Sequence, residues 1–151
     1  MRNTGRLDAF DTSWHRLAAL KPRLARSGLS NVHPVAIAHE RDDRIKRLAG
    51  KIDRVLVDAP CSGFGTLRRN PDLKWRQTEA GIAELTAKQS RILTAAAALV
   101  KPGGRVVYAT CSFIRAENQD VVTAFLAAHP QFRLLPANEV FAQNKIPLDT
   151  G

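Results

Sequence analysis

The sequence predicts an α/β fold with a doubly wound parallel sheet, on three observations. Short apolar, β-branched stretches alternate with longer stretches in which apolar residues recur at helical spacing. Two of the apolar stretches end abruptly at polar segments, as buried parallel strands do when they run into functional loops. The chain has 151 residues, 44% of them hydrophobic, so we expect one globular domain over residues 1–151.

The first expected unit is a strand followed by a helix. Residues 6–10 (RLDAF) predict a short strand, and residues 11–13 offer side chains that can cap a helix. The helix is expected over residues 14–27, where leucines recur at helical spacing. Gly28 is the expected end of this helix.

Two more strands are expected before the middle of the chain. Residues 32–38 (VHPVAIA) predict one of them, and Pro34 indicates an edge position or a later start of the strand, because proline cannot donate to a strand ladder. The charged run 39–51 predicts a loop with a short helix. Residues 52–57 (IDRVLV) have the pattern of a buried parallel strand.

The remaining elements continue the alternation. A loop is expected to reach residue 75, followed by a long amphipathic helix over residues 78–100 that Lys-Pro-Gly-Gly closes. Residues 105–110 (RVVYAT) predict the next strand, residues 117–128 a helix and residues 132–135 a final strand. In such folds, ligands bind beyond the carboxyl ends of the strands.

Charge and cysteine content limit the classes of function. A net charge of +9 favours polyanionic partners, although lysine and arginine on helix faces often serve only solvation. No apolar run approaches the roughly 20 residues that cross a bilayer, and the N-terminus lacks the apolar core of a signal peptide, so we expect a cytoplasmic protein. Two cysteines are too few for an all-cysteine zinc site, and no metal is expected.

The cysteines follow two expected strands directly. Cys61 comes after IDRVLVDAP and Cys111 after RVVYAT, with one crossover helix between them. Consecutive parallel strands usually neighbour each other, so both thiols and Asp58 are expected to share one pocket at the sheet edge. The alternative is that both cysteines are small buried hydrophobic residues.

The wording of these segments resembles one family closely. The stretch Asp58-Ala-Pro-Cys-Ser-Gly-Phe-Gly-Thr-Leu-Arg-Arg-Asn-Pro-Asp-Leu-Lys-Trp, with Tyr108-Ala-Thr-Cys-Ser and Glu117-Asn118 downstream, is similar to the RNA (cytosine-5) methyltransferases of the Nop2/Sun superfamily. Within it, the chain looks most like the branch of the bacterial rRNA small-subunit methyltransferase B enzymes. The resemblance implies a class I S-adenosylmethionine-dependent methyltransferase that acts on RNA, with rRNA favoured over tRNA.

The resemblance also implies a role for each residue of the expected pocket. Cys111 would be the nucleophile that adds to C6 of cytosine, which gives C5 the carbanion character it needs to accept a methyl group. Cys61 would serve the release step, and Asp58 would hydrogen-bond the N3 edge of the base. A nucleophilic thiol needs its thiolate at neutral pH, so we expect a lowered pKa for Cys111. Gly63 and Gly65 would let the backbone pass close to the base or the cofactor.

For the cofactor, the resemblance implies acidic residues at strand ends. Asp11 matches the residue that binds the ribose hydroxyls, although an aspartate there could equally cap the following helix. The residue on the adenine side would fall at His39 or Glu40. Asp58 lies at the edge that base and cofactor would share.

In the loop after Cys61, Arg68, Arg69 and Lys74 could contact RNA phosphates. The nearby Trp75 could stack on a base, but we expect it to anchor the loop in the core.

The family's first strand, its glycine-containing cofactor loop and a catalytic lysine would precede RLDAF, and its last motif and C-terminal hairpin would follow Asp149-Thr150-Gly151. We therefore expect a partial catalytic domain. The family's first strand is a central one, so a sheet without it would have unpaired backbone groups on the two interior strands that normally flank it. An inactive fragment or RNA-binding remnant is the main alternative function, and a methyltransferase acting on protein or DNA is a third.

Overall fold

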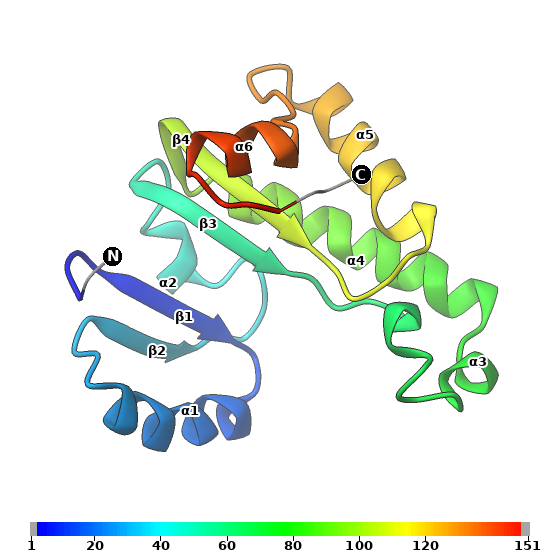
Figure 1. Ribbon diagram of the computed structural model, residues 1–151, viewed down its shortest axis with the longest axis horizontal. Coiled ribbons are helices and arrows are strands. Elements are labelled where there is room, and N and C mark those ends of the chain that lie inside the picture. The colour runs from blue at the N-terminus through cyan, green and yellow to red at the C-terminus, as the bar shows by residue number, and fades with distance from the viewer. Residues whose placement is uncertain (1–2, 149–151) are drawn as a thin grey trace. The chain divides into compact units, whose positions relative to one another are not determined.

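The computed structural model of the chain describes residues 3–148, which form an α/β structure (Figure 1). The expectation that the family's last motif would follow residues 149–151 lies outside the described residues. The elements in order are β1 (Leu7–Asp11), α1 (Trp14–Ser27), β2 (Val32–Ala36), α2 (Asp43–Lys46), β3 (Ile52–Asp58), the 3-10 turn η1 (Phe64–Thr66), α3 (Leu73–Arg76), α4 (Glu79–Ala97), β4 (Val100–Ala109), the 3-10 turn η2 (Arg115–Glu117), α5 (Gln119–Ala128) and α6 (Ala137–Gln143).

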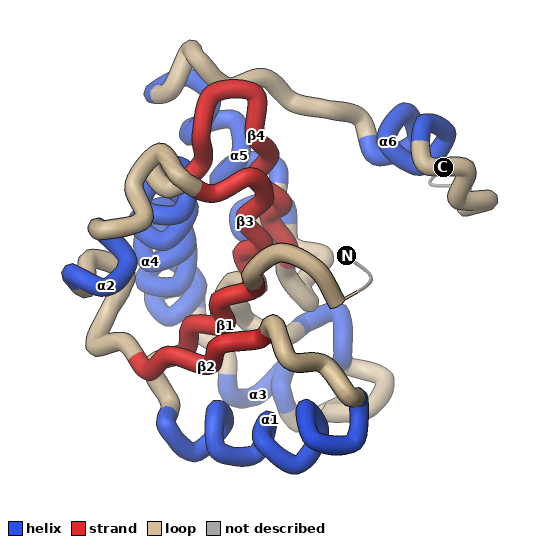
Figure 2. Tube along the Cα trace, turned by 90° about the vertical axis from the view of Figure 1, so that its left-hand side faces the viewer, coloured by secondary structure: helices blue, strands red, loops and turns tan. Residues whose placement is uncertain are grey.

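The first sheet consists of β1 and β2, which pair in parallel with Leu7 opposite Val32 and Asp11 opposite Ala36. Helix α1 connects them and lies along the pair in Figure 2, with Leu17 buried. The Ser13 side chain caps α1 by accepting the Arg16 N–H, and the helix ends at Gly28 in the left-handed conformation (φ 66°). The predicted strand–helix–strand unit is confirmed.

The second sheet pairs β3 with β4, whose arrows run the same way in Figure 1. The expected adjacency of the two cysteine-bearing strands is therefore confirmed. Strand β4 begins at Val100, five residues earlier than expected. The reason is that the backbone already pairs there, since the Ile52 N–H donates to the Leu99 carbonyl at 2.9 Å.

Gly104 marks a close approach of β4 to β3. A Cβ atom at this position would lie 2.8 Å from the Asp53 carbonyl oxygen and 2.5 Å from Cγ1 of Val100. Because the nearest groups include backbone, Gly104→Ala is expected to lower the free energy of unfolding by about 2 kcal/mol. Urea denaturation of both proteins measures this, and an unchanged midpoint would contradict the close approach.

The described residues divide into two compact units, one formed by residues 3–57 with 95–107 and the other by 58–94 with 108–148. Each has its own buried apolar residues. In the first unit these are Leu17, Ile45, Val57, Ala96, Ala97 and Leu99, and in the second they are Ala59, Leu93 and Val121. The second unit also buries three polar side chains, Ser62, Gln89 and Glu117, and contains both cysteines.

The C-terminal part differs from the expected pattern. Residues 132–135 form no strand, and helix α6, which the sequence analysis did not predict, follows them. The ring of Phe132 packs edge-on against Phe125 of α5, with ring centroids 5.3 Å apart. Its apolar side chain therefore faces a helix instead of a sheet. Helix α5 begins at Gln119, because Glu117 belongs to η2.

The segment expected as a plain loop up to residue 75 contains two short helical turns, η1 and α3. Local backbone bonds close them, including Thr66 N–H to Gly63 O at 2.8 Å and Trp75 N–H to Asp72 O at 3.0 Å. Among the described residues, no helix has the length and apolar character needed to cross a membrane.

Candidate active site

The two cysteines lie side by side at the ends of neighbouring strands. The Ala59 N–H donates to the Ala109 carbonyl at 2.9 Å, so the chain segments that leave β3 and β4 are still paired where the loops begin. Cys61 and Cys111 then bring their sulfur atoms to 3.2 Å from each other. Both are free thiols; Cys111 is exposed and Cys61 half-buried. The predicted meeting of the two thiols is confirmed, and the alternative of two buried hydrophobic residues is wrong. That they share a ligand pocket with Asp58 stays a prediction.

Gly65 brings the loop after Cys61 against the backbone that carries Cys111. Its N–H donates to the Cys111 carbonyl at 2.9 Å. A Cβ atom at Gly65 would lie 2.8 Å from that same carbonyl oxygen. Gly65 therefore has to be glycine because of the Cys111 backbone, and the expected approach of this loop to the base or the cofactor stays a prediction. Gly63 has a different reason to be glycine, because its φ is 77°.

The pKa of the Cys111 thiol is raised, and the expected lowering is wrong. The main cause is the hydrogen bond with Cys61, which favours the protonated thiol; burial and the negative charges of Cys61 and Asp58 act in the same direction. Asp58 is exposed at the end of β3, and its negative charge is the weakest of the causes that raise the pKa of Cys111. The sequence could not show that a second thiol would form a hydrogen bond with this sulfur and that its acidic neighbours would raise its pKa.

Cys61→Ala is expected to lower the pKa of Cys111, because it removes the largest of the causes that raise it. The rate of alkylation of Cys111 by iodoacetamide, followed from pH 6 to pH 10.5, should rise with a lower midpoint in this variant than in the wild-type protein. Asp58→Asn should move the midpoint in the same direction by less. A midpoint that stays in place in Cys61→Ala would contradict the thiol–thiol hydrogen bond as the cause.

Beneath the thiols lies a buried polar cluster formed by Ser62, Gln89 and Glu117. The Ser62 N–H and hydroxyl donate to the two Glu117 carboxylate oxygens at 2.8 and 2.5 Å, and Gln89 Nε2 donates to Oε1 at 3.1 Å. Gln89 Nε2 also donates to the Pro60 carbonyl at 2.9 Å. From the sequence, Glu117 stood out only as part of a motif, and Gln89 was not recognised as a buried residue of the site. The one sequence signal for Gln89 was its spacing, which places it on the apolar face of α4.

Tyr108 joins this cluster from β4. Its hydroxyl donates to the Glu117 carbonyl at 2.8 Å. Burial, with smaller contributions from the charges of Glu117 and Cys61, raises the pKa of Tyr108 to about 12. The tyrosine therefore stays a neutral donor at any physiological pH, and it ties the strand that leads to Cys111 to the turn that carries Glu117.

The proposed cofactor residues Asp11, His39 and Glu40 all belong to the first unit. The Ile37 N–H donates to the Asp11 carbonyl at 3.0 Å, so residues 39 and 40 follow closely on the same sheet end as Asp11. The Asp11 side chain accepts the Ser13 N–H at 2.7 Å and pairs with Arg16 at 2.8 Å. Burial acts to raise the pKa of Asp11, but these hydrogen bonds outweigh it and lower the pKa. The capping residue of α1 is Ser13, so the alternative role of Asp11 as the cap is wrong.

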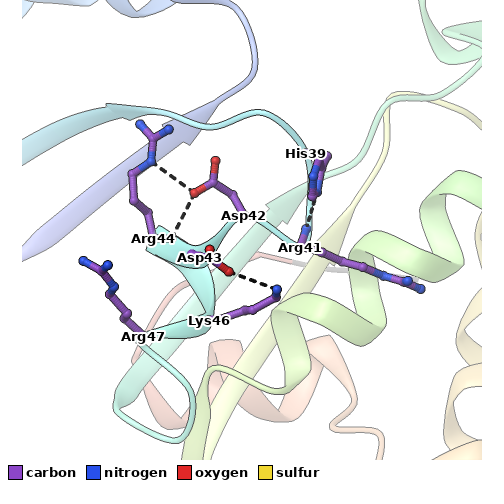
Figure 3. A pocket seen from close by; sticks show the side chains of 7 residues that line it. All are labelled: His39, Arg41, Asp42, Asp43, Arg44, Lys46 and Arg47. Carbon is purple, nitrogen blue, oxygen red and sulfur yellow. Dashed lines mark hydrogen bonds and ion pairs between the residues drawn. The ribbon is translucent and has the colours of Figure 1, made fainter.

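A cavity of about 510 Å³ follows β2 (Figure 3). Of the expected cofactor residues only His39 lines it, and its Nδ1 accepts the Arg41 N–H at 3.1 Å. Asp42 pairs with Arg44 at 3.1 Å, and Asp43 with Lys46 at 3.0 Å. With four basic side chains against two acidic ones, the cavity is better suited to an anion than to a neutral ligand.

The basic residues of the loop after Cys61 are exposed, as RNA contact requires. Arg68, Arg69 and Lys74 all face solvent. The expectation that Trp75 anchors the loop in the core is wrong, because 81% of its surface is exposed. Helix α3 turns the indole outward, and Lys74 Nζ lies 4.9 Å from the centre of its ring. Within residues 3–148, no group of three or more histidine, cysteine, aspartate or glutamate side chains could hold a metal ion.

Sequence comparison identifies relatives along nearly the whole chain. A family model described as 16S rRNA methyltransferase RsmB/F matches residues 1–148. The probable ribosomal RNA small subunit methyltransferase B of Bacillus subtilis (strain 168) is 39% identical over 133 residues, which are 87% of this chain and 29% of that protein. Its counterpart from Synechocystis (strain PCC 6803) is 41% identical over 136 residues, 90% of this chain and 30% of that protein. The chain thus spans less than a third of the length of these relatives.

Solved structures give the same result. The crystal structure of PH0851 matches 100% of this chain and 32% of its own, with a TM-score of 0.86 and 39% identity. NSun6 from Pyrococcus horikoshii, solved with SFG, matches 83% of this chain and 31% of its own, with a TM-score of 0.72 and 29% identity. The α/β architecture with parallel strands is therefore shared with methyltransferase structures.

Proposed function

Because the chain belongs to the 16S rRNA methyltransferase RsmB/F family, we propose that it is the catalytic segment of an enzyme that methylates C5 of cytosine in RNA, with rRNA as the substrate and S-adenosylmethionine as the methyl donor. The observation that carries the proposal is the pair of free thiols, 3.2 Å apart just beyond the ends of neighbouring strands, one of which ends at Asp58. We further infer that the strands belong to the doubly wound sheet of a class I methyltransferase. The described residues form part of that sheet, and its first strand and C-terminal hairpin are not among them.

The first proposed step is the attack on the base. Cys111 gives up its proton, the base gains a proton at N3, the sulfur bonds to C6, and the electron pair of the C5=C6 bond moves into the ring. Asp58 hydrogen-bonds the N3 edge and stabilises the proton gained there. Exposure of Cys111 favours this role, because a base can reach the sulfur. A target cytosine must be unpaired or flipped out of its stack to do so.

Cys61 serves the release step in this proposal. Bound S-adenosylmethionine would supply the electrophilic methyl group that C5 takes. Cys61, as a thiolate that has lost its proton to solvent, then accepts the proton from C5. The C5=C6 bond forms again, and the Cys111 sulfur leaves as a thiolate that takes back the proton held at N3. The half-buried position of Cys61 beside Cys111 supports this assignment, since one base must present C5 and C6 to the two sulfurs in turn.

For the cofactor, Asp11 fits the role of ribose acceptor. It is an ionised carboxylate at the carboxyl end of a parallel strand, partly exposed in spite of its contact with Arg16. His39 and Glu40 follow on the same sheet end and are the candidates for the adenine side, with Asp58 assigned to the edge shared with the base. The NSun6 structure solved with SFG, an analogue of S-adenosylmethionine, supports the choice of cofactor.

RNA would be held by Arg68, Arg69 and Lys74 through phosphate contacts. The exposed Trp75 adds a flat surface on which a base could stack. The net charge of +9 agrees with a polyanionic partner.

Trapping with RNA that contains 5-fluorocytosine tests the proposal. Fluorine at C5 cannot leave as a proton does, so an enzyme with S-adenosylmethionine should form an adduct that survives denaturing electrophoresis. The raised pKa of Cys111 favours one alternative, an RNA-binding remnant without turnover. Binding of the RNA without any adduct up to pH 9 would support that alternative. DNA of the same sequence, run alongside, should give no adduct.

A further inference from the structure

Glu117 is a charged residue in the interior of the second unit, with 0% of its surface exposed. It lies in η2, between β4 and α5, away from any expected contact with substrate. Removal of a carboxylate from water costs several kcal/mol unless hydrogen bonds replace the lost hydration. Its burial therefore has to be explained by what its oxygens hold.

On one side, Glu117 holds the residue that follows Cys61. Both donors of Ser62, the backbone N–H and the hydroxyl, point to the two carboxylate oxygens, at 2.8 and 2.5 Å. Ser62 itself is 1% exposed. A backbone bond so close to Cys61 leaves the position of its Cα little freedom.

On the other side, Ser112, the residue that follows Cys111, adjoins the same cluster. Its hydroxyl lies 3.2 Å from the Ser62 hydroxyl, and its interaction with the carboxylate helps to lower the pKa of Glu117. Burial alone would raise this pKa, but the donors from Ser112, Ser62 and Gln89 outweigh it. The carboxylate remains ionised and can accept from all of them.

We infer that Glu117 is a positioning residue, which fixes the separation of the Cys61 and Cys111 sulfurs. It binds Ser62, which follows Cys61, and through the Ser62 hydroxyl it reaches Ser112, which follows Cys111. The inference deepens the proposed function and rests on it for its biological meaning. Gln89 braces the carboxylate from α4, since its Nε2 donates both to Glu117 and to the Pro60 carbonyl. The cluster formed by Ser62, Gln89 and Glu117 therefore connects the loops that carry the two thiols to helix α4.

The equilibrium between the dithiol and an intramolecular Cys61–Cys111 disulfide tests this inference. In glutathione buffer, oxidised glutathione takes two electrons and two protons from the two thiols, which gives one protein disulfide and two reduced glutathiones. The equilibrium constant reports how closely the sulfurs are held. Glu117→Ala should move it toward the dithiol by about tenfold or more, since several hydrogen bonds to a charged group are lost.

Glu117→Gln should rescue the geometry. Its amide oxygen can accept from Ser62 N–H and Gln89, while its NH₂ group donates to the Ser62 hydroxyl, so the constant should stay within about threefold of wild type. Glu117→Asp keeps the charge but is too short to reach both serines, and should resemble Glu117→Ala. Circular dichroism checks folding, and Glu84→Ala on the exposed face of α4 is the matched control.

An unchanged constant in Glu117→Asp or Glu117→Ala would overturn the inference. An equilibrium constant for disulfide formation as low in Glu117→Gln as in Glu117→Ala would also overturn it. The charge of Glu117, and not the geometry of its hydrogen bonds, would then determine the separation of the sulfurs. If Glu117→Ala does not fold, Glu117→Asp and Glu117→Gln still give opposite expected results. Because this equilibrium involves neither RNA nor cofactor, its outcome is distinguishable from failure of the 5-fluorocytosine trap.

Discussion

Replacement of Cys111 by serine is expected to abolish the covalent adduct with RNA that contains 5-fluorocytosine. A hydroxyl group is ionised far less than a thiol and is a much weaker nucleophile, so the bond to C6 should not form. The fraction of labelled RNA that migrates with the protein in denaturing electrophoresis measures this. The expected loss is complete within the sensitivity of the gel.

Replacement of Cys61 by serine should have the opposite effect with ordinary cytosine. Attack through Cys111 remains possible, but the step that removes the C5 proton loses its base, so the adduct should accumulate where the wild-type protein shows none. Glu84→Gln, an exposed change on α4, serves as the control. If the two serine variants behaved alike, the division of roles between the thiols would be wrong.

Gly65→Ala should be the most damaging change that touches no reactive atom. The new Cβ would lie 2.8 Å from the Cys111 carbonyl oxygen and 3.2 Å from its carbonyl carbon. These are backbone atoms and cannot rotate away as a side chain can, so the strand end that carries the thiol must move. We expect a loss of about 2 to 3 kcal/mol in the free energy of unfolding.

The same variant should also separate the sulfurs, and the disulfide equilibrium should move toward the dithiol. Gly81→Ala is a suitable control, since its Cβ would meet only the Thr78 hydroxyl at 3.2 Å and alanine favours the helix that contains it. A Gly65→Ala protein with wild-type stability and an unchanged equilibrium would contradict the close packing of the two loops.

Several features were predictable because they depend on local sequence. The start of α1 just after the polar residues 11–13, its end at Gly28 and the edge strand with Pro34 follow from backbone chemistry that neighbouring residues determine. Other features were not predictable in this way. Helix α6 and the absence of a strand at residues 132–135 depend on what the segment packs against, and short apolar runs do not reveal that.

By itself, the sequence determined that the two cysteines follow consecutive strands of an α/β fold. Such strands usually neighbour each other, so the sequence predicted that the thiols meet at one sheet edge, as they do. Only the tertiary structure decided how those thiols are tuned and held. The raised pKa of Cys111 and the burial of Glu117 depend on neighbours that are distant in sequence. Trp75 is exposed because the short helix α3 directs its side chain to solvent. Charge, burial and hydrogen bonding depend on distances in space, which residue spacing along a chain does not contain.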